Sequence, residues 1–267
     1  MELAENQTSL LSTARFDQNF NSQPNYVAKI GQPMGMIYGY IYEGTYKYDD
    51  FDKSGSSYTL KGNIPHYVSE SNTQPGMPKY KDLNGDGIID TNDRTMIGRG
   101  LPIHTGGFTN NFEYKGFDLS VFFQWSYGND VLNANRLFFD SGFQKKRELN
   151  QYASYTDRWT PENPNSNIPA ATNSSSNLVI SSRVVEDASF LRLKTVTLGY
   201  TVPKTFLKKY KIDNARLYVA AQNLWTITGY SGYDPEVSIR SGGLTPGLDF
   251  SSYPRALSVS FGINLGF

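Results

Sequence analysis

The chain has 267 residues, in which 25 Lys and Arg residues balance 25 Asp and Glu residues, and it contains no cysteine. The neutral balance gives no support for nucleic acid as a partner, and the lack of cysteine excludes disulfides, thiolate metal sites and cysteine nucleophiles. Aromatic residues make up 14% of the chain while hydrophobic residues as a whole reach only 38%, which favours strands over helices.

Period-two alternation of apolar and polar residues predicts six strands along the chain. In chain order they span about Gly35 to Tyr46, Phe108 to Tyr114, Phe117 to Tyr127, Phe190 to Val202, Ala215 to Thr226 and Leu257 to Phe267. In each of them one face is largely apolar and the other is small or polar. No run of about 18 apolar residues occurs, so no transmembrane helix is predicted.

Short connections are predicted at two places between these strands. Lys115-Gly116 joins two of them, because Gly supplies the positive φ that a tight hairpin needs. Pro203 ends the strand that begins at Phe190, and a short helical turn is expected over Lys204 to Ile212. Within that strand the apolar phase changes, which predicts a bulge near Lys194-Thr195.

Short and long connections alternate along the chain, so all short ones fall at one end of the strands. The long ones span about Tyr48 to Gly100, Gly128 to Asp187 and Thr228 to Tyr253. Short periplasmic turns and long extracellular loops are typical of a transmembrane β-barrel. The predicted fold class is therefore all-β, an antiparallel transmembrane β-barrel segment. Six strands are fewer than the eight or so of the smallest single-chain barrels, so we expect a part of a larger barrel. A soluble β-sandwich remains the alternative.

The beginning of the chain does not read as a secretory signal. Residues Met1 to Arg15 include Glu2 and Glu5 and lack a continuous apolar stretch. An outer-membrane protein needs such a signal, so we expect Met1 to be an internal or artificial start and the natural N-terminus to be missing.

Residues 82 to 93 read D-L-N-G-D-G-I-I-D-T-N-D, close to the calcium loop of EF-hand proteins. Calcium takes several oxygen ligands, which alternate residues of a tight loop supply. Gly87 stands where such a loop turns sharply, and the last position holds an Asp where Glu is usual. The predicted ligands of a structural calcium ion are the side chains of Asp82, Asn84, Asp86, Asp90 and Asp93 and the backbone carbonyl of Ile88. The alternative is a polar turn without metal.

No pattern for catalysis is present. His66 and His104 are the only histidines, no nucleophile is spaced to pair with them, and no GxSxG, HExxH or P-loop sequence occurs. We therefore predict that the chain is not an enzyme. Trp159, Tyr230 and Tyr233 lie in predicted outer loops, where they are candidates for stacking on sugar rings or for packing against a lid protein. The alternative is that these rings pack within their own loops.

Several motifs stand in a fixed order from residue 31 to the end of the chain. They are GQPMGMIYGYIYEG (31–44), KDLNGDGIIDTNDR (81–94), RWTPENPN (158–165), FLRLKTVTLGY (190–200), AQNL (221–224), GYDPE (232–236) and the closing Phe267. Together they resemble the SusC/RagA family of TonB-dependent outer-membrane transporters. Residues 31–267, with the loop 82–93, are thus expected to be the C-terminal barrel segment of such a protein, and residues 1–30 stay poorly assigned.

The resemblance implies a barrel of about 22 strands, plugged by an N-terminal domain, in the outer membrane. It also implies a SusD-like surface lipoprotein as a lid, the TonB complex as energy source, and uptake of oligosaccharides or peptides. Phe267 would be an assembly signal for the barrel assembly machinery, or simply a terminal aromatic that faces lipid. We expect this sequence to hold only the C-terminal part of that pattern, without the signal, the plug, the TonB-contacting segment and most strands. The alternative function is a secreted calcium-binding β-sandwich that adheres to polysaccharide.

Overall fold

The computed structural model describes residues 8–11, 25–140, 150–172, 178–239 and 242–267. The chain forms two compact units, and each combines stretches that are far apart in the sequence. Unit 1 comprises residues 1–101, 130–186 and 237–252, and unit 2 comprises residues 102–129, 187–236 and 253–267. Residues 31–267, which the sequence predicts as one barrel segment, are thus divided between the two units. Among the described residues, no helix is long and apolar enough to cross a membrane.

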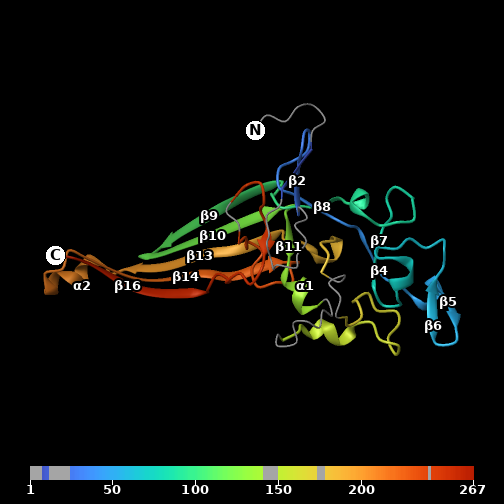
Figure 1. Cartoon of the computed structure of the whole chain (residues 1–267). Coiled ribbons are helices and arrows are strands. Elements are labelled where there is room, and N and C mark those ends of the chain that lie inside the picture. The colour runs from blue at the N-terminus through green and yellow to red at the C-terminus, as the bar shows by residue number, and fades with distance from the viewer. Residues whose placement is uncertain (1–7, 12–24, 141–149, 173–177, 240–241) are drawn as a thin grey trace. The chain divides into compact units, whose positions relative to one another are not determined.

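Unit 2 is built on one five-stranded antiparallel sheet with the strand order β16-β14-β13-β10-β9. Figure 1 shows these long strands side by side. Their bounds are His104–Tyr114 for β9, Phe117–Tyr127 for β10, Phe190–Thr201 for β13, Asn214–Thr228 for β14 and Ser258–Gly266 for β16. Strands that follow one another in the unit are neighbours in the sheet, which is the up-and-down order of a barrel wall. The five strands predicted after residue 107 are confirmed, with small differences at their ends.

Short connections join the strands of unit 2 as predicted. Both residues of the Lys115-Gly116 turn have positive φ, 46° and 86°, as in a type I′ turn, whose twist matches that of the flanking strands. The helix α2 (Lys204–Leu207) and a 3₁₀ turn at Lys208–Tyr210 link β13 to β14, which confirms the helical turn. The register between β13 and β14 shifts between Leu193 and Thr195, which confirms the bulge.

One face of this sheet is apolar across all five strands, because the register places the apolar phase of each strand beside that of its neighbour. One row of partners runs Phe112, Leu119, Leu198, Val219 and Phe261, and the next runs Tyr114, Phe117, Tyr200, Leu217 and Ile263. Many of these side chains are open to their surroundings, and Phe261 is 82% exposed. Water-soluble monomers rarely leave so extended an apolar surface uncovered.

Unit 1 consists of short strands in several small sheets. The orders are β1-β2-β3-β8 and β12-β11-β15, while β4 pairs with β7 and β5 with β6. The bounds are Thr8–Leu11 (β1), Tyr26–Lys29 (β2), Met36–Gly39 (β3), Tyr42–Thr45 (β4), Phe51–Ser54 (β5), Ser57–Leu60 (β6), Pro78–Tyr80 (β7), Thr95–Arg99 (β8), Asp130–Asn133 (β11), Val185–Asp187 (β12) and Leu248–Asp249 (β15). The helix α1 spans Asn135–Phe139, and 3₁₀ turns lie at Tyr48–Asp50, Glu70–Asn72, Thr91–Asp93, Ala153–Asp157 and Ser182–Val184.

The core of unit 1 is closed, unlike the apolar face of unit 2. Its largest cluster includes Tyr26, Ile37, Leu132 and Leu248, all of which are fully buried. Leu132 on β11 and Leu248 on β15 are paired neighbours in one sheet, although 116 positions separate them in the sequence. Such burial is typical of a domain that is surrounded by water.

The strand expected from Gly35 to Tyr46 is wrong as a single spanning strand. Met36–Gly39 forms β3 and Tyr42–Thr45 forms β4, and the two belong to different sheets of unit 1. Tyr40 between them is buried, and its ring lies 5.4 Å from that of Tyr80. The alternating tyrosines therefore fill a protein core, and the described part of the chain holds five long strands instead of six.

Candidate functional site

The polar face of the five-stranded sheet carries the charged groups of unit 2. One row of cross-strand partners on this face is Asn111, Ser120, Thr197, Ala220 and Ser260. Two ionic groupings stand on the same face, one around Arg192 of β13 and one that joins Asp118 of β10 to Arg216 of β14. This face therefore combines small, uncharged side chains with paired charges.

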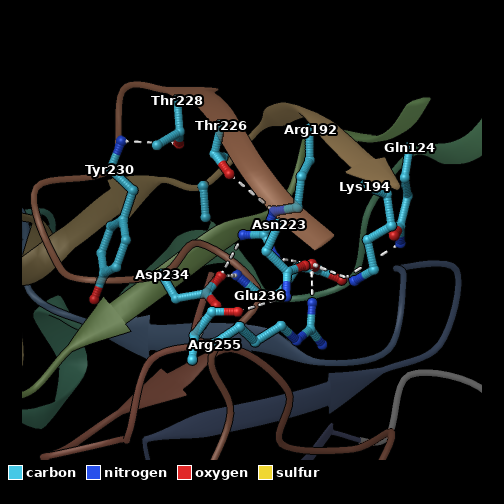
Figure 2. Close-up of polar contacts among 12 residues, drawn as sticks. Gln124, Arg192, Lys194, Asn223, Thr226, Thr228, Tyr230, Asp234, Glu236 and Arg255 are labelled. Atoms are coloured by element: carbon cyan, nitrogen blue, oxygen red, sulfur yellow. Dashed lines mark hydrogen bonds and ion pairs between the residues drawn. The ribbon is translucent and has the colours of Figure 1, made fainter. Parts of the chain in front are cut away.

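Arg192 is the centre of a charged cluster (Figure 2). Its Nη2 donates to Asp234 Oδ1 and its Nη1 to Glu236 Oε2, both over 2.7 Å, and its Nε donates to Thr226 Oγ1 over 2.9 Å. The guanidinium carbon also lies 5.2 Å from the centre of the Phe190 ring. Arg192 is only 3% exposed. Its positive charge is therefore buried, and the carboxylates of Asp234 and Glu236 compensate it.

The cluster also ties in the stretch of chain before β16. Glu236 forms an ion pair with Arg255, and Lys194 Nζ lies 3.8 Å from the same carboxylate oxygen, Oε2. Asp234 accepts hydrogen bonds from the backbone N–H groups of Glu236 over 3.0 Å and Arg255 over 3.2 Å. Three cations thus face two carboxylates, and when all are ionised one positive charge remains in excess.

The second ionic grouping depends on a glycine between its partners. Arg216 donates to both carboxylate oxygens of Asp118 across β13, and the Nε to Oδ1 distance is 3.0 Å. Gly199 of β13 lies between them, and a Cβ there would stand only 2.4 Å from Arg216 Nη2 and 2.5 Å from Asp118 Oδ1. Any larger residue at position 199 would therefore push the pair apart.

The predicted calcium loop, residues 82–93, is a tight turn closed by its own side chains. Asp82 accepts hydrogen bonds from the backbone N–H groups of Gly85 over 2.6 Å and Gly87 over 2.8 Å. Both glycines have positive φ, 78° and 82°, which they adopt without strain. The N–H of Gly87 is the main cause that lowers the pKa of the Asp82 carboxyl below its ordinary value.

The end of the loop is fixed by the carboxylate at its last position. Asp93 is fully buried and accepts hydrogen bonds from the N–H groups of Leu83 and Asp90, both over 2.8 Å. Asp90 in turn caps the 3₁₀ turn Thr91–Asp93. Ile88 is anchored through its backbone, which bridges to His66.

The predicted ligands of calcium all belong to this loop. They are Asp82, Asn84, Asp86, Ile88, Asp90 and Asp93. Their oxygen donors suit calcium, but the carboxylates of Asp82, Asp86 and Asp93 accept from backbone N–H groups. Within the described ranges, no group of three or more acidic or histidine side chains is placed to hold a metal ion. Calcium binding therefore stays a prediction.

The aromatic candidates from the outer loops differ in exposure. Trp159 is buried in unit 1 with its ring 5.5 Å from that of Tyr48, and Tyr230 is buried in unit 2. Tyr233 is 84% exposed. Burial shows that the first two rings pack against protein, Trp159 against Tyr48 of another predicted loop, whereas the ring of Tyr233 is open to its surroundings. Phe267 is also exposed, beyond the end of β16, and its role in assembly stays a prediction.

The sequence reasoning missed the cluster around Arg192. Four of its five charged residues lie in the motifs 190–200 and 232–236, which the sequence analysis used only as family features, and the fifth, Arg255, lies outside both. The available signal was their charge, because the first motif contains R-L-K and the second D-P-E. Opposite charges in two motifs favour a contact, but they do not specify which groups meet.

Relatives with known names match most of the chain, although no family model does. The chain is 35% identical over 254 residues to TonB-dependent receptor P3 of Formosa agariphila. The matched region covers 93% of this chain and 24% of that receptor. The chain is 28% identical over 201 residues to TonB-dependent receptor SusC of Bacteroides thetaiotaomicron, covering 75% of the chain and 18% of that receptor. The chain thus spans at most about a quarter of the length of these two relatives.

Solved structures give the same picture. The chain is similar to the structure of the RagAB peptide transporter, with a TM-score of 0.65 and 26% identity over 91% of this chain and 24% of that chain. The RagAB peptide importer in its "closed-closed" state matches with a TM-score of 0.66 and 25% identity over the same shares. These matches confirm the predicted fold class, an antiparallel barrel segment that the described strands leave open.

Proposed function

Because this chain is homologous to the TonB-dependent receptors of the SusC/RagA type, as its motifs predict, we propose that it forms part of the barrel wall of an outer-membrane nutrient importer. The chain spans about a quarter of P3 and of the RagAB chain, so activity and partners belong to the longer protein. The observation that carries the proposal is the open apolar face of the five-stranded sheet.

The apolar face supports contact with lipid. Burying one Phe or Leu side chain is worth roughly 1.5–3 kcal/mol relative to leaving it in water, so rows of exposed rings are costly there. Acyl chains remove that cost, and a transmembrane β-strand needs about 9–11 residues. The strands of unit 2 have 11, 11, 12, 15 and 9 residues. Each is therefore long enough to cross a bilayer.

The polar face supports a wet interior on the other side of the wall. Strands of outer-membrane barrels alternate between an apolar outside and a polar lumen. The Asp118–Arg216 pair and the Arg192 cluster all stand on the polar face. Charged groups that faced acyl chains would be costly, whereas a lumen accepts them.

The alternative, a secreted calcium-binding β-sandwich, lacks comparable support. In a sandwich the apolar face of each sheet is buried against the other sheet. Phe261 and Ile263 in the edge strand β16 are instead highly exposed. The relatives are named as receptors, a transporter or an importer.

For the longer protein we propose uptake of oligosaccharides or peptides, energised by the TonB complex and gated by a SusD-like surface lipoprotein. The RagAB relatives are named as a peptide transporter and a peptide importer, which supports this kind of cargo and a two-component assembly. We expect the longer protein to lie in the lipid of the outer membrane. The barrel assembly machinery would insert it and would recognise Phe267.

We also propose that the loop 82–93 holds a structural calcium ion on the outer side of the membrane. The support is its oxygen-only donor set and a turn that is already formed around Gly85 and Gly87. A divalent cation would offset the repulsion between Asp82, Asp86 and Asp90. Its role would be to fix a long loop, and it would take part in no reaction.

Fractionation of cells that express the full-length protein tests the proposed function. We expect the protein in the outer membrane, extracted only by detergent, with a gel migration that changes on heating. A full-length protein that stays monomeric and soluble without detergent would contradict the proposal.

A further inference from the structure

The loop that follows β14 folds back over the polar face of the sheet. Its residues Asp234 and Glu236 reach Arg192 on β13, and Gln124 Nε2 on β10 lies 3.4 Å from Glu236 Oε1. Figure 2 shows these side chains pointing toward one another from the strands and the loop. The Asp234-Pro235-Glu236 stretch therefore lies against the polar face instead of leading away from it.

One side chain holds most of this arrangement. The planar fork of an Arg guanidinium presents fixed donor directions, and here they reach Asp234, Glu236 and Thr226. Hydrogen bonds between two ionised groups are about twice as strong as neutral ones. Removing the guanidinium would leave Asp234, itself buried, without its charged partner and held only by the backbone N–H groups of Glu236 and Arg255, so the loop would have to open to hydrate it.

The loop is also fixed from its far side. Arg255, three residues before β16, pairs with Glu236 and donates its backbone N–H to Asp234. Asn223 Nδ2 donates to the carbonyl of Ala256 over 3.0 Å, which holds the same stretch at β14. Both ends of the β14–β16 connection are thus bound at the polar face, and the two carboxylates join them.

We propose that Arg192 is a positioning residue that clamps the loop after β14 onto the polar face, so that the loop narrows the passage lined by this face. The motifs 190–200 and 232–236 then form one structural device. That the face lines a passage rests on the proposed function, whereas the clamp rests only on the contacts within unit 2.

Cysteine reporters in the full-length receptor test the clamp. Gln124 and Gln222 both lie on the polar face, but Gln124 is half-buried and hydrogen-bonds to Glu236 of the clamped loop, whereas Gln222 is exposed. Each is replaced by Cys, in a chain segment that has no other cysteine, and the rate of reaction with N-ethylmaleimide is measured in outer-membrane vesicles. Without further change, the cysteine at 124 should react more slowly than the one at 222.

Substitution of Arg192 by Met should speed the reaction at position 124 by at least about tenfold and change that at 222 less than twofold. Arg192→Lys should give an intermediate rate, because one point charge replaces the fork. Equal acceleration at both positions, or acceleration at neither, would overturn the clamp. Failure of the fractionation experiment would remove the passage, but the same reaction rates, measured then on the soluble protein, would still test the clamp.

Discussion

Replacing Val196 by Arg tests which solvent meets the apolar face. Val196 lies on β13 between Val121 of β10 and Ala221 of β14. An Arg on the lipid face near the middle of a membrane costs a β-barrel about 2–4 kcal/mol. Since 1.36 kcal/mol is a factor of ten, the folding equilibrium of the full-length receptor should fall roughly 30-fold to 900-fold.

The matched control is Thr197→Arg, one residue further along the same strand. Thr197 is half-buried like Val196, but it lies on the polar face beside Ser120 and Ala220. There we expect a change within about 0.5 kcal/mol. The assay is the fraction of receptor in outer membranes that migrates as folded protein in unheated gels. Equal loss, or no loss, in the two variants would refute the assignment of the faces.

Three further predictions concern unit 1. Leu132→Ala should destabilise unit 1 by about 2–5 kcal/mol, since the side chain is fully buried. On heating, protease cleavage within unit 1 should begin at a lower temperature, while the heat-dependent gel migration of the receptor persists. A chelator should speed protease cleavage around Asp86, and unchanged cleavage with and without it would count against calcium. The pKa of Asp82 is lowered, so the ionised carboxylate stabilises the turn fully at a pH above its ordinary pKa of 3.8. This stabilisation is lost as the pH falls through the lower pKa of the folded state. Protection of the Gly87 N–H from hydrogen exchange, taken relative to the intrinsic exchange rate at each pH, should therefore fall below about pH 4, and an Asp82→Asn variant should lack that pH dependence.

The long strands of unit 2 were predictable because apolar and polar residues alternate along most of their length, which indicates a strand with one apolar face. The turn at Lys115-Gly116 carries its own local signal, since Gly adopts the positive φ of a tight hairpin without strain. The strand from Gly35 to Tyr46 failed for a physical reason. Alternating tyrosines suit a lipid face and a small aromatic core equally well, and only the partner across from Tyr40, the ring of Tyr80, decides between them.

The rest of unit 1 depends on contacts between distant positions. Strands of four residues, such as β3 and β4, carry too few alternations to be recognised. Their partners lie far along the chain, as the pairing of Leu132 with Leu248 illustrates. The candidate calcium loop was local and easy to find, whereas the Arg192 cluster joins groups 42 and 44 positions apart.

Collision of nitroxide labels with oxygen and with a water-soluble nickel complex tests the two-faced wall most directly. Labels are placed one at a time along β16 in the full-length receptor in lipid bilayers. One set is Val259, Phe261 and Ile263, and the other is Ser258, Ser260 and Asn264. We predict that the first set collides mainly with oxygen dissolved in the acyl chains and the second relatively more with the nickel complex. A first set shielded from both reagents, as in a dry protein core, would contradict the account.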